Sequence, residues 1–289
     1  MASPERDPVT GYKTTGHEWD GIKELTTPIP HWWVSVFLAT VGIAIVYLYL
    51  MPSFAGVKGF LPGALEWSSS KQLAEDQAVA AAAQAGWRKR ILETPLAEIE
   101  ADPDLRRFAV TGGRALFNEN CAPCHGVGAG GQQGQFPALI DDDWLWGGKI
   151  EDIHQTISHG IRNEDDDSRQ STMPSFADIL APEQIDQVAD YVRALSDPSQ
   201  EATRTAMPGA KVFTDNCASC HGDHGQGGRE FGAPTLNDAI WLYGGSKQAI
   251  ISQVTHPRMG VMPTFAARLD EATIRMLATY VHTLGGGER

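Results

Sequence analysis

Two pentapeptides of identical spacing hold every cysteine of this sequence. Cys121-Ala-Pro-Cys-His125 and Cys217-Ala-Ser-Cys-His221 account for all 4 cysteines of the 289-residue chain. Cys-x-x-Cys-His is the c-type haem attachment string, in which both thiols add to porphyrin vinyl groups and the imidazole becomes the proximal iron ligand. The sequence therefore predicts two covalently bound haem c groups. The predicted thioether residues are Cys121, Cys124, Cys217 and Cys220, and the predicted proximal ligands are His125 and His221.

Zinc sites, redox dithiols and disulfides also use Cys-x-x-Cys. Zinc would need both pairs to come together across more than 90 residues. A redox dithiol needs no histidine directly after the second cysteine. Haem attachment is therefore the preferred interpretation.

The sixth iron ligand must come from elsewhere in the chain. Met173 and Met262 lie 52 and 45 residues after the first cysteine of their strings, each in a Met-Pro-Ser/Thr-Phe sequence. A thioether ligand favours the reduced iron, so both methionines are predicted axial ligands. His159 and His256 occupy matching positions and are rival ligands. A methionine of one unit could also reach the iron of the other, and the sequence leaves this crossed arrangement open.

An internal repeat surrounds the two strings. The segment 113–126 aligns with 209–222 at an offset of 96 residues, and the similarity continues through a Trp-Leu-Trp/Tyr-Gly-Gly motif to the Met-Pro strings. Apolar residues with helical period close each unit and a helix opens it, so we expect the opening helix to pack on the closing helix of its own unit. No strand pattern of similar strength is present. The predicted fold is all-α, with two tandem class I cytochrome c domains at residues 108–198 and 206–289.

An uncharged apolar block precedes the repeats. Trp32 to Met51 contains twenty residues, which as a helix would cross a hydrocarbon core of about 30 Å. The block is too long for the apolar part of a signal peptide and lacks a cleavage site. We predict a polar segment at 1–31, a transmembrane helix at 32–51, and a juxtamembrane turn with an Ala-rich spacer helix at 52–107.

Lysine and arginine counts on the two sides do not orient this helix. Bacterial c-type haem is attached outside the cytoplasmic membrane. The predicted topology is therefore a single pass through the bacterial inner membrane, with the N-terminus cytoplasmic and the haem domains periplasmic.

The charge balance restricts the partners. A net charge of −13 argues against nucleic acid and permits a basic protein. Residues 108–198 carry 5 Lys/Arg and 15 Asp/Glu, whereas 207–289 carry 7 of each. We expect a basic soluble donor to dock on the first unit, near Asp165, Asp166 and Asp167. This acidic run lacks the ligand spacing of an EF-hand, so we interpret it as a solvated loop.

The lead-in Thr15-Gly-His-Glu-Trp-Asp-Gly-Ile-Lys-Glu-Leu25, the following Pro28-Ile-Pro-His-Trp-Trp33 and the stretch 58–67 complete a resemblance over essentially the whole chain. The chain resembles subunit III, the dihaem subunit, of cbb3-type cytochrome c oxidases. The resemblance implies a non-catalytic subunit that passes electrons from soluble cytochrome c or a quinol-oxidising complex to a catalytic haem b/copper subunit, where oxygen is reduced to water. It also implies a monohaem cytochrome c subunit and membrane lipid as partners. Carried over by position, Met173 would serve the first haem and Met262 the second.

Two other functions compete with this one. A membrane-tethered dihaem carrier could serve another respiratory enzyme, such as a nitric oxide reductase or a periplasmic dehydrogenase, and the haem strings alone do not separate it from an oxidase subunit. A dihaem peroxidase would need an iron position that opens, which matched methionines argue against.

Overall fold

The computed structural model describes residues 5–57 and 59–288. It divides into two compact units, Met1–Ala83 and Gln84–Arg289. The outermost residues of the predicted 1–31 and 206–289 segments lie outside the described residues. So does Lys58, one of the lysines counted beside the membrane helix. The two units are described separately.

The N-terminal unit begins with a small hairpin that the sequence analysis did not predict. Strand β1 (Thr14–Trp19) pairs antiparallel with β2 (Ile22–Leu25), and Trp19 faces Ile22 in register. The turn residues Asp20 and Gly21 have φ angles of 48° and 84°. Asp-Gly with two positive φ angles is a favoured two-residue hairpin turn, so this dipeptide was the signal that could have revealed the hairpin.

Helix α1 (His31–Leu50) matches the predicted membrane segment. It is twenty residues long, and none of its residues is buried within the protein. It is the helix that is long and apolar enough to cross a membrane among those in the described parts of the chain. A second small hairpin, β3 (Ala55–Gly56) with β4 (Gly59–Phe60), follows it. Helix α2 (Ser69–Glu93) covers the predicted spacer.

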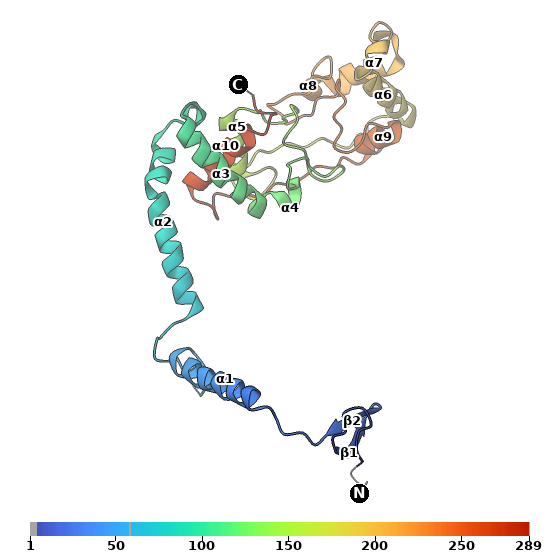
Figure 1. Cartoon of the computed structure of the whole chain (residues 1–289). Helices are drawn as coiled ribbons and strands as arrows, with labels where there is room; N and C mark the ends of the chain where they lie inside the picture. The colour runs from blue at the N-terminus through green and yellow to red at the C-terminus, as the bar shows by residue number, and fades with distance from the viewer. Residues whose placement is uncertain (1–4, 58, 289) are drawn as a thin grey trace. The chain divides into compact units, whose positions relative to one another are not determined.

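The C-terminal unit repeats one order of helices. Each repeat contains an opening helix, a short helix with the Cys-x-x-Cys-His string, a middle helix and a closing helix (Figure 1). The first repeat has α3 (Pro103–Asn120), α4 (Ala122–His125), α5 (Ile150–His159) and α6 (Pro182–Leu195). The second has α7 (Pro208–Asn216), α8 (Ala218–His221), α9 (Lys247–Thr255) and α10 (Glu271–His282). Short 3-10 turns lie at Leu96–Ala101, Pro198–Gln200 and Arg204–Ala206.

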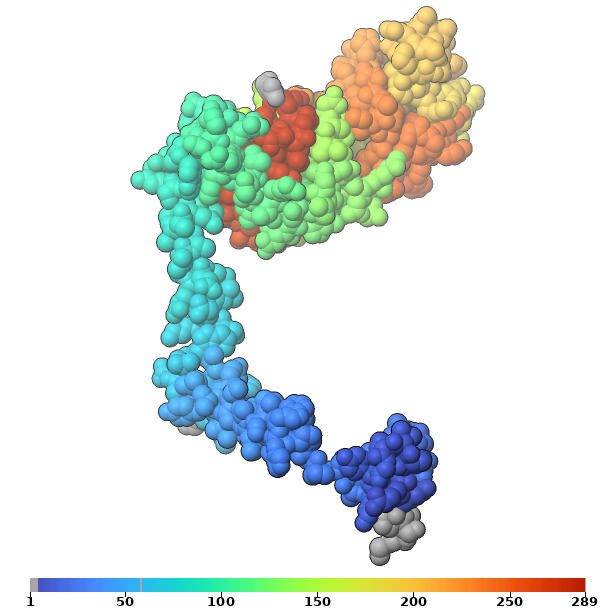
Figure 2. Space-filling model, in the orientation of Figure 1, coloured from blue at the N-terminus to red at the C-terminus, as the bar shows by residue number. Residues whose placement is uncertain are grey.

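The closing helices are exchanged between the repeats. Phe117 of α3, which is fully buried, shares a core with Leu277 and Tyr280 of α10. Phe213 of α7, also fully buried, shares a second core with Val188 and Tyr191 of α6. Figure 1 shows α10 beside α3 and α5, and α6 beside α7 and α9. In Figure 2 the red surface of α10 accordingly lies between green surfaces of the first repeat.

The expectation that each opening helix packs on its own closing helix is therefore wrong. The physical reason lies in the segments that lead from the middle helix to the closing helix. These segments meet as an antiparallel pair at Ile161 and Met262. Each segment then leads its closing helix to the opening helix of the other repeat. Residues 108–198 and 206–289 thus mark the sequence repeats, whereas each hydrophobic core draws on both of them.

A third cluster joins the end of α2 to the exchanged helix. Ile91 and Ile99, both fully buried, pack with Met276 of α10. Arg88 donates to both carboxylate oxygens of Asp270, at 2.5 and 2.7 Å, and Asp270 caps α10 by accepting from the Thr273 amide. These contacts fix the start of α10 on the spacer side of the protein.

Gly113 tests the exchange, because α3 approaches α10 at this residue. A Cβ atom there would clash with the Met276 carbonyl oxygen and lie 2.7 Å from the Tyr280 Cβ atom. We expect Gly113→Ala to lower the free energy of unfolding by about 1–3 kcal/mol, since backbone atoms cannot yield easily. Urea unfolding of the detergent-solubilised chain, followed by helical circular dichroism, would measure the loss. Gly86→Ala in α2 is the matched control, because no atom lies within 4 Å of its new Cβ. Equal stability of the two variants would contradict this α3–α10 contact.

Candidate haem sites

Each Cys-x-x-Cys-His string forms one helical turn directly after an opening helix. Cys121 links α3 to α4 with φ −113° and ψ −36°, and Cys217 links α7 to α8 with φ −116° and ψ −34°. The amides of His125 and His221 donate to the carbonyls of these cysteines, at 2.9 and 3.0 Å. One turn of helix therefore holds two thiols and an imidazole close together, and both sites have nearly the same local geometry.

Both histidines are fixed by a backbone carbonyl of their own repeat. His125 Nδ1 lies 3.0 Å from the Pro137 carbonyl oxygen, and His221 Nδ1 lies 3.0 Å from that of Pro234. Nδ1 must carry the hydrogen in these bonds, which leaves the lone pair on Nε2 free for a metal. Burial lowers the pKa of both imidazoles, more than the carbonyl bonds raise it, so both are neutral at pH 7. A neutral imidazole with a free Nε2 is the form that binds iron.

The two proline carbonyls were not among the residues predicted from the sequence. The signal was present in the repeat, because Phe136-Pro137 and Ala233-Pro234 follow the two strings at nearly equal spacing. These prolines were hidden among the many Gly and Pro residues of the loops. Only the fold shows that their carbonyls point to the histidines.

None of the four cysteines forms a disulfide. Burial, with a smaller contribution from the second cysteine of each string, raises the pKa of Cys121 and Cys217 to about 11. Reactive dithiols instead have lowered thiol pKa values. Cys121 packs on one hydrophobic core and Cys217 on the other, so the two pairs do not form a single four-cysteine zinc site. The surroundings fit thiols that are consumed by thioether bonds.

The methionines lie with the string of the opposite repeat. Met262 and Cys121 pack against the core formed by α3, α5 and α10. Met173 and Cys217 pack against the core formed by α6, α7 and α9. This packing follows from the exchange of the closing helices, and it differs from the pairing by position along the chain.

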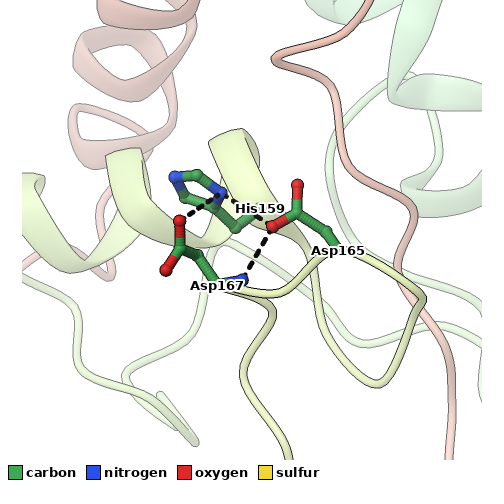
Figure 3. Close-up of side chains that lie close together, drawn as sticks. All are labelled: His159, Asp165 and Asp167. Carbon is green, nitrogen blue, oxygen red and sulfur yellow. Dashed lines mark hydrogen bonds and ion pairs between the residues drawn. The ribbon is translucent and has the colours of Figure 1, made fainter.

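The rival histidines have other contacts. His159 Nδ1 lies 3.0 Å from Asp165 Oδ1, and Asp167 Oδ2 is 3.9 Å away (Figure 3). His256 is exposed, and its Nδ1 lies 3.0 Å from the Thr255 hydroxyl. The three side chains in Figure 3 form a hydrogen-bonded group, which the Asp167 amide completes by donating to Asp165 at 2.9 Å. The acidic run is therefore partly ordered by His159 rather than wholly solvated.

An unpaired buried donor gives a further indication that the sites fit haem. Trp146 is 9% exposed, and its Nε1 has no hydrogen-bond partner among the described residues. Buried polar groups in native proteins are nearly always paired. A haem propionate is an acceptor of the kind that this indole lacks. The donor set of two thiols, a tautomer-fixed imidazole and a nearby thioether therefore fits a c-type haem in each core.

Comparisons with known proteins agree with this chemistry along the whole chain. Residues 11–58 match the family described as the N-terminal domain of cytochrome oxidase-cbb3, FixP. Residues 110–196 match cytochrome c, and residues 204–281 match cytochrome c oxidase, cbb3-type, subunit III.

Full-length relatives are closely similar. The cbb3-type cytochrome c oxidase subunit FixP of Sinorhizobium medicae is 50% identical over 284 residues, which cover 98% of this chain and 97% of the relative. The subunit CcoP of Cereibacter sphaeroides is 49% identical over 95% of each chain. The subunit FixP of Azorhizobium caulinodans is 46% identical over 98% of this chain and 96% of the relative. A chain of the Kuenenia stuttgartiensis reducing HAO-like protein complex is 20% identical with a TM-score of 0.17, too low to support an argument.

The helical fold, the apolar helix α1 and the two repeated sites define a membrane-anchored dihaem cytochrome c. Near-complete alignment at about half identity makes the membership specific: this chain belongs to the FixP/CcoP family, subunit III of the cbb3-type cytochrome c oxidases. It is an electron-transfer subunit with two covalently bound haem c groups, and it associates with the other subunits of the oxidase complex.

An acidic cleft of about 420 Å³ lies between loops of the two repeats, with Asp143 and Trp144 on one wall and Gln226 and Arg229 on the other. Burial, followed by repulsion from Asp238 and Asp141, raises the pKa of Asp143 to about 6. In the folded protein this carboxyl therefore holds its proton to a higher pH than in the unfolded chain.

This pKa shift predicts a pH-dependent stability. Because the folded pKa is raised, the contribution of Asp143 is fully present below the unfolded value of 3.8 and is lost as the pH rises through about 6. We expect Asp143→Asn to raise the thermal midpoint at pH 7.5 but to leave it nearly unchanged at pH 4. Asp142→Asn is the matched control, because this neighbouring carboxyl is exposed. A gain for Asp143→Asn that is the same at both pH values would contradict the assignment.

Proposed function

We propose that this subunit carries electrons from a basic donor, through both of its haems, to the catalytic haem b/copper subunit that reduces oxygen to water. The observation that supports this function is the pair of equivalent Cys-x-x-Cys-His turns, each with its histidine fixed by a proline carbonyl. A haem iron that cycles between ferric and ferrous states carries one electron. The residues around each string would hold the haem against an apolar core, and the proline carbonyls would fix its proximal histidine.

The proposal includes crossed sixth ligands. Met262 would complete the haem held by Cys121, Cys124 and His125, and Met173 would complete the haem held by the second string. The shared cores of Met262 with Cys121 and of Met173 with Cys217 support this assignment. Thioether ligation favours the reduced iron and so raises the reduction potential. The engagement of His159 with Asp165 favours methionine over histidine as the sixth ligand.

The proposed location is the bacterial inner membrane, with residues 1–31 in the cytoplasm and the haem domains in the periplasm. Haem c is attached on the periplasmic side, and α1 is the membrane-length helix that precedes the haem domains. Membrane lipid would surround α1, because no residue of this helix is buried within the protein. A quinol-oxidising complex remains a second possible source of electrons, because it would meet the haem domains on the same side.

The acidic first repeat is the proposed docking surface for a basic soluble cytochrome c. Asp166 and Asp167 are exposed, whereas Asp165 is half-buried against His159. The net charge of −10 over 108–198, against zero over 207–289, would steer a basic donor to this repeat. Family membership favours an oxidase subunit over a carrier for another respiratory enzyme or a dihaem peroxidase.

Crossed ligation can be tested one haem at a time. In a chain with Cys121→Ala and Cys124→Ala, only the haem on Cys217 is attached. We expect Met173→Leu in this background to remove the charge-transfer band of Met-ligated ferric haem, whereas Met262→Leu keeps it. The reverse result would show ligation within each repeat. A haem c content of one per chain and unchanged helical circular dichroism would confirm that each variant folds.

Docking and topology can be tested together with right-side-out membrane vesicles. We expect an added basic cytochrome c to drive oxygen consumption in these vesicles but not in inverted ones.

At low ionic strength, Asp166→Asn with Asp167→Asn should slow electron entry by a factor on the order of 2 to 10, and salt should remove the difference. Asp223→Asn with Glu230→Gln is the control, because it removes two exposed charges from the second repeat. Equal rates for all variants would exclude docking at Asp166 and Asp167, and activity only in inverted vesicles would exclude the topology.

A further inference from the structure

The two segments that lead to the methionines differ in length and in structure. Thirteen residues separate His159 from Met173, whereas five separate His256 from Met262. The longer segment, residues 160–172, contains the acidic run and lies beside Met262 rather than only leading to Met173. The shorter segment, 257–261, has too few residues to make the same contacts.

Met262 is held by three hydrogen bonds from the longer segment. Ile161 and Met262 exchange both backbone bonds, each at 3.0 Å. The side-chain amide of Asn163 donates to the Met262 carbonyl oxygen at 2.7 Å and to the His159 carbonyl oxygen at 2.8 Å. Asn163 thus ties the methionine backbone to the end of α5.

Asn163 is itself fixed on its other sides. Its side-chain oxygen accepts from the Asp165 backbone amide at 2.7 Å. The Asn163 backbone amide donates to the Ser168 hydroxyl at 3.2 Å. Ser168 is 6% exposed. Asp165 is in turn held by His159, as Figure 3 shows. The asparagine therefore lies in an ordered network and has little freedom to leave Met262.

Gly160 allows this close approach. It has a φ of +72°, and a Cβ atom there would clash with Asn163 Nδ2 and with the Met262 carbonyl oxygen. The corresponding residue after His256 is Pro257, which has a φ near −65° and no amide hydrogen. The second repeat therefore cannot build the same structure around Met173.

The contacts of Met173 are weaker. Its amide lies 3.3 Å from the Met259 sulfur atom, and no hydrogen bond reaches its carbonyl oxygen from the residues that the structure describes. The shorter segment is tied to α9 instead, because the Gln253 side chain bonds to both the amide and the carbonyl of Arg258. Met173 is tied to its neighbours mainly through Ser175 and Phe176.

We propose that Asn163 is a positioning residue that holds Met262 in place as an iron ligand, so that the two haems of this subunit retain their methionines with different strength. The inference rests on the proposed ligand role of Met262. A backbone that is already ordered loses less conformational entropy when its side chain binds iron. Ligand-supporting contacts of this kind typically change metal binding by about 10- to 100-fold. The haem served by Met262 should therefore resist competing ligands better than the haem served by Met173.

The test is an imidazole titration of the ferric full-length chain in detergent, with both haems attached. The unmodified chain should show two phases, and the weaker phase should belong to the haem served by Met262. Asn163→Ala should tighten imidazole binding in that phase by about tenfold, because a looser methionine competes less well. The other phase should keep its affinity. Ser168→Ala, which removes one support of Asn163, should act in the same direction with a smaller effect.

Two controls assign the result. Met262→Leu removes the competing sulfur, so the phase that becomes very tight in this chain identifies the haem that Met262 serves. If neither phase tightens, Met262 is not a ligand, and both the ligand proposal and the proposed role of Asn163 are overturned. Gln253→Ala, which releases the corresponding segment of the other repeat from α9, should leave the Met262 phase unchanged.

The proposal for Asn163 is overturned if Met262→Leu identifies a phase that Asn163→Ala does not change. It is also overturned if Asn163→Ala shifts both phases equally, since that result would indicate a general loosening of the protein. Asp166→Asn, an exposed change in the same segment, should leave both phases as they are. Ser168→Ala keeps the proposal testable if Asn163→Ala does not fold.

Discussion

The burial of each closing helix against the opening helix of the other repeat is the interaction on which the rest of this subunit depends. Helices α6 and α10 have apolar faces that must leave water, and each finds its partner across the repeat boundary. The α3–α10 and α6–α7 contacts are the most extensive between helices of the C-terminal unit. Neither haem core can therefore be complete until both repeats have been synthesised and folded together.

With the proposed crossed methionines, the exchange also divides the ligands of each haem between local and distant sequence. The cysteines and histidine come from one helical turn, and the histidine is fixed by a proline 12 or 13 residues further on. In the proposed arrangement the methionine would come from the opposite repeat, through segments that meet at Ile161 and Met262. The proximal side of each haem would thus be formed by local sequence, whereas the distal side would depend on how the two repeats pack together. The Ile161–Met262 pair therefore links the segments that lead to the two methionines.

The duplicated sequence has produced two sites that are similar but unequal. The histidine turns agree closely in backbone angles, because four of their five residues are identical and form the same helical turn. The methionine surroundings diverge, because one repeat has Gly160, Asn163 and a long acidic segment where the other has Pro257 and a short one. The acidic segment thus combines an exposed charged surface with an internal hydrogen-bonded group that contacts Met262. Such a difference allows one subunit to present two electron carriers with distinct properties.

The sequence by itself determined the haem strings, the repeat, the membrane helix and the family, because each depends on residue types at short, regular spacing. It did not determine which helix packs on which, since the apolar faces of α6 and α10 are equally suited to either opening helix. The two prolines recur at nearly equal spacing, but only the loop paths show that Pro137 and Pro234 support the histidines and that Asn163 contacts Met262. The Asp20-Gly21 turn was visible in the sequence, but the polar segment around it has no strong strand pattern. Only the tertiary structure decided how the two repeats share their cores, because long-range packing is set by the whole chain at once.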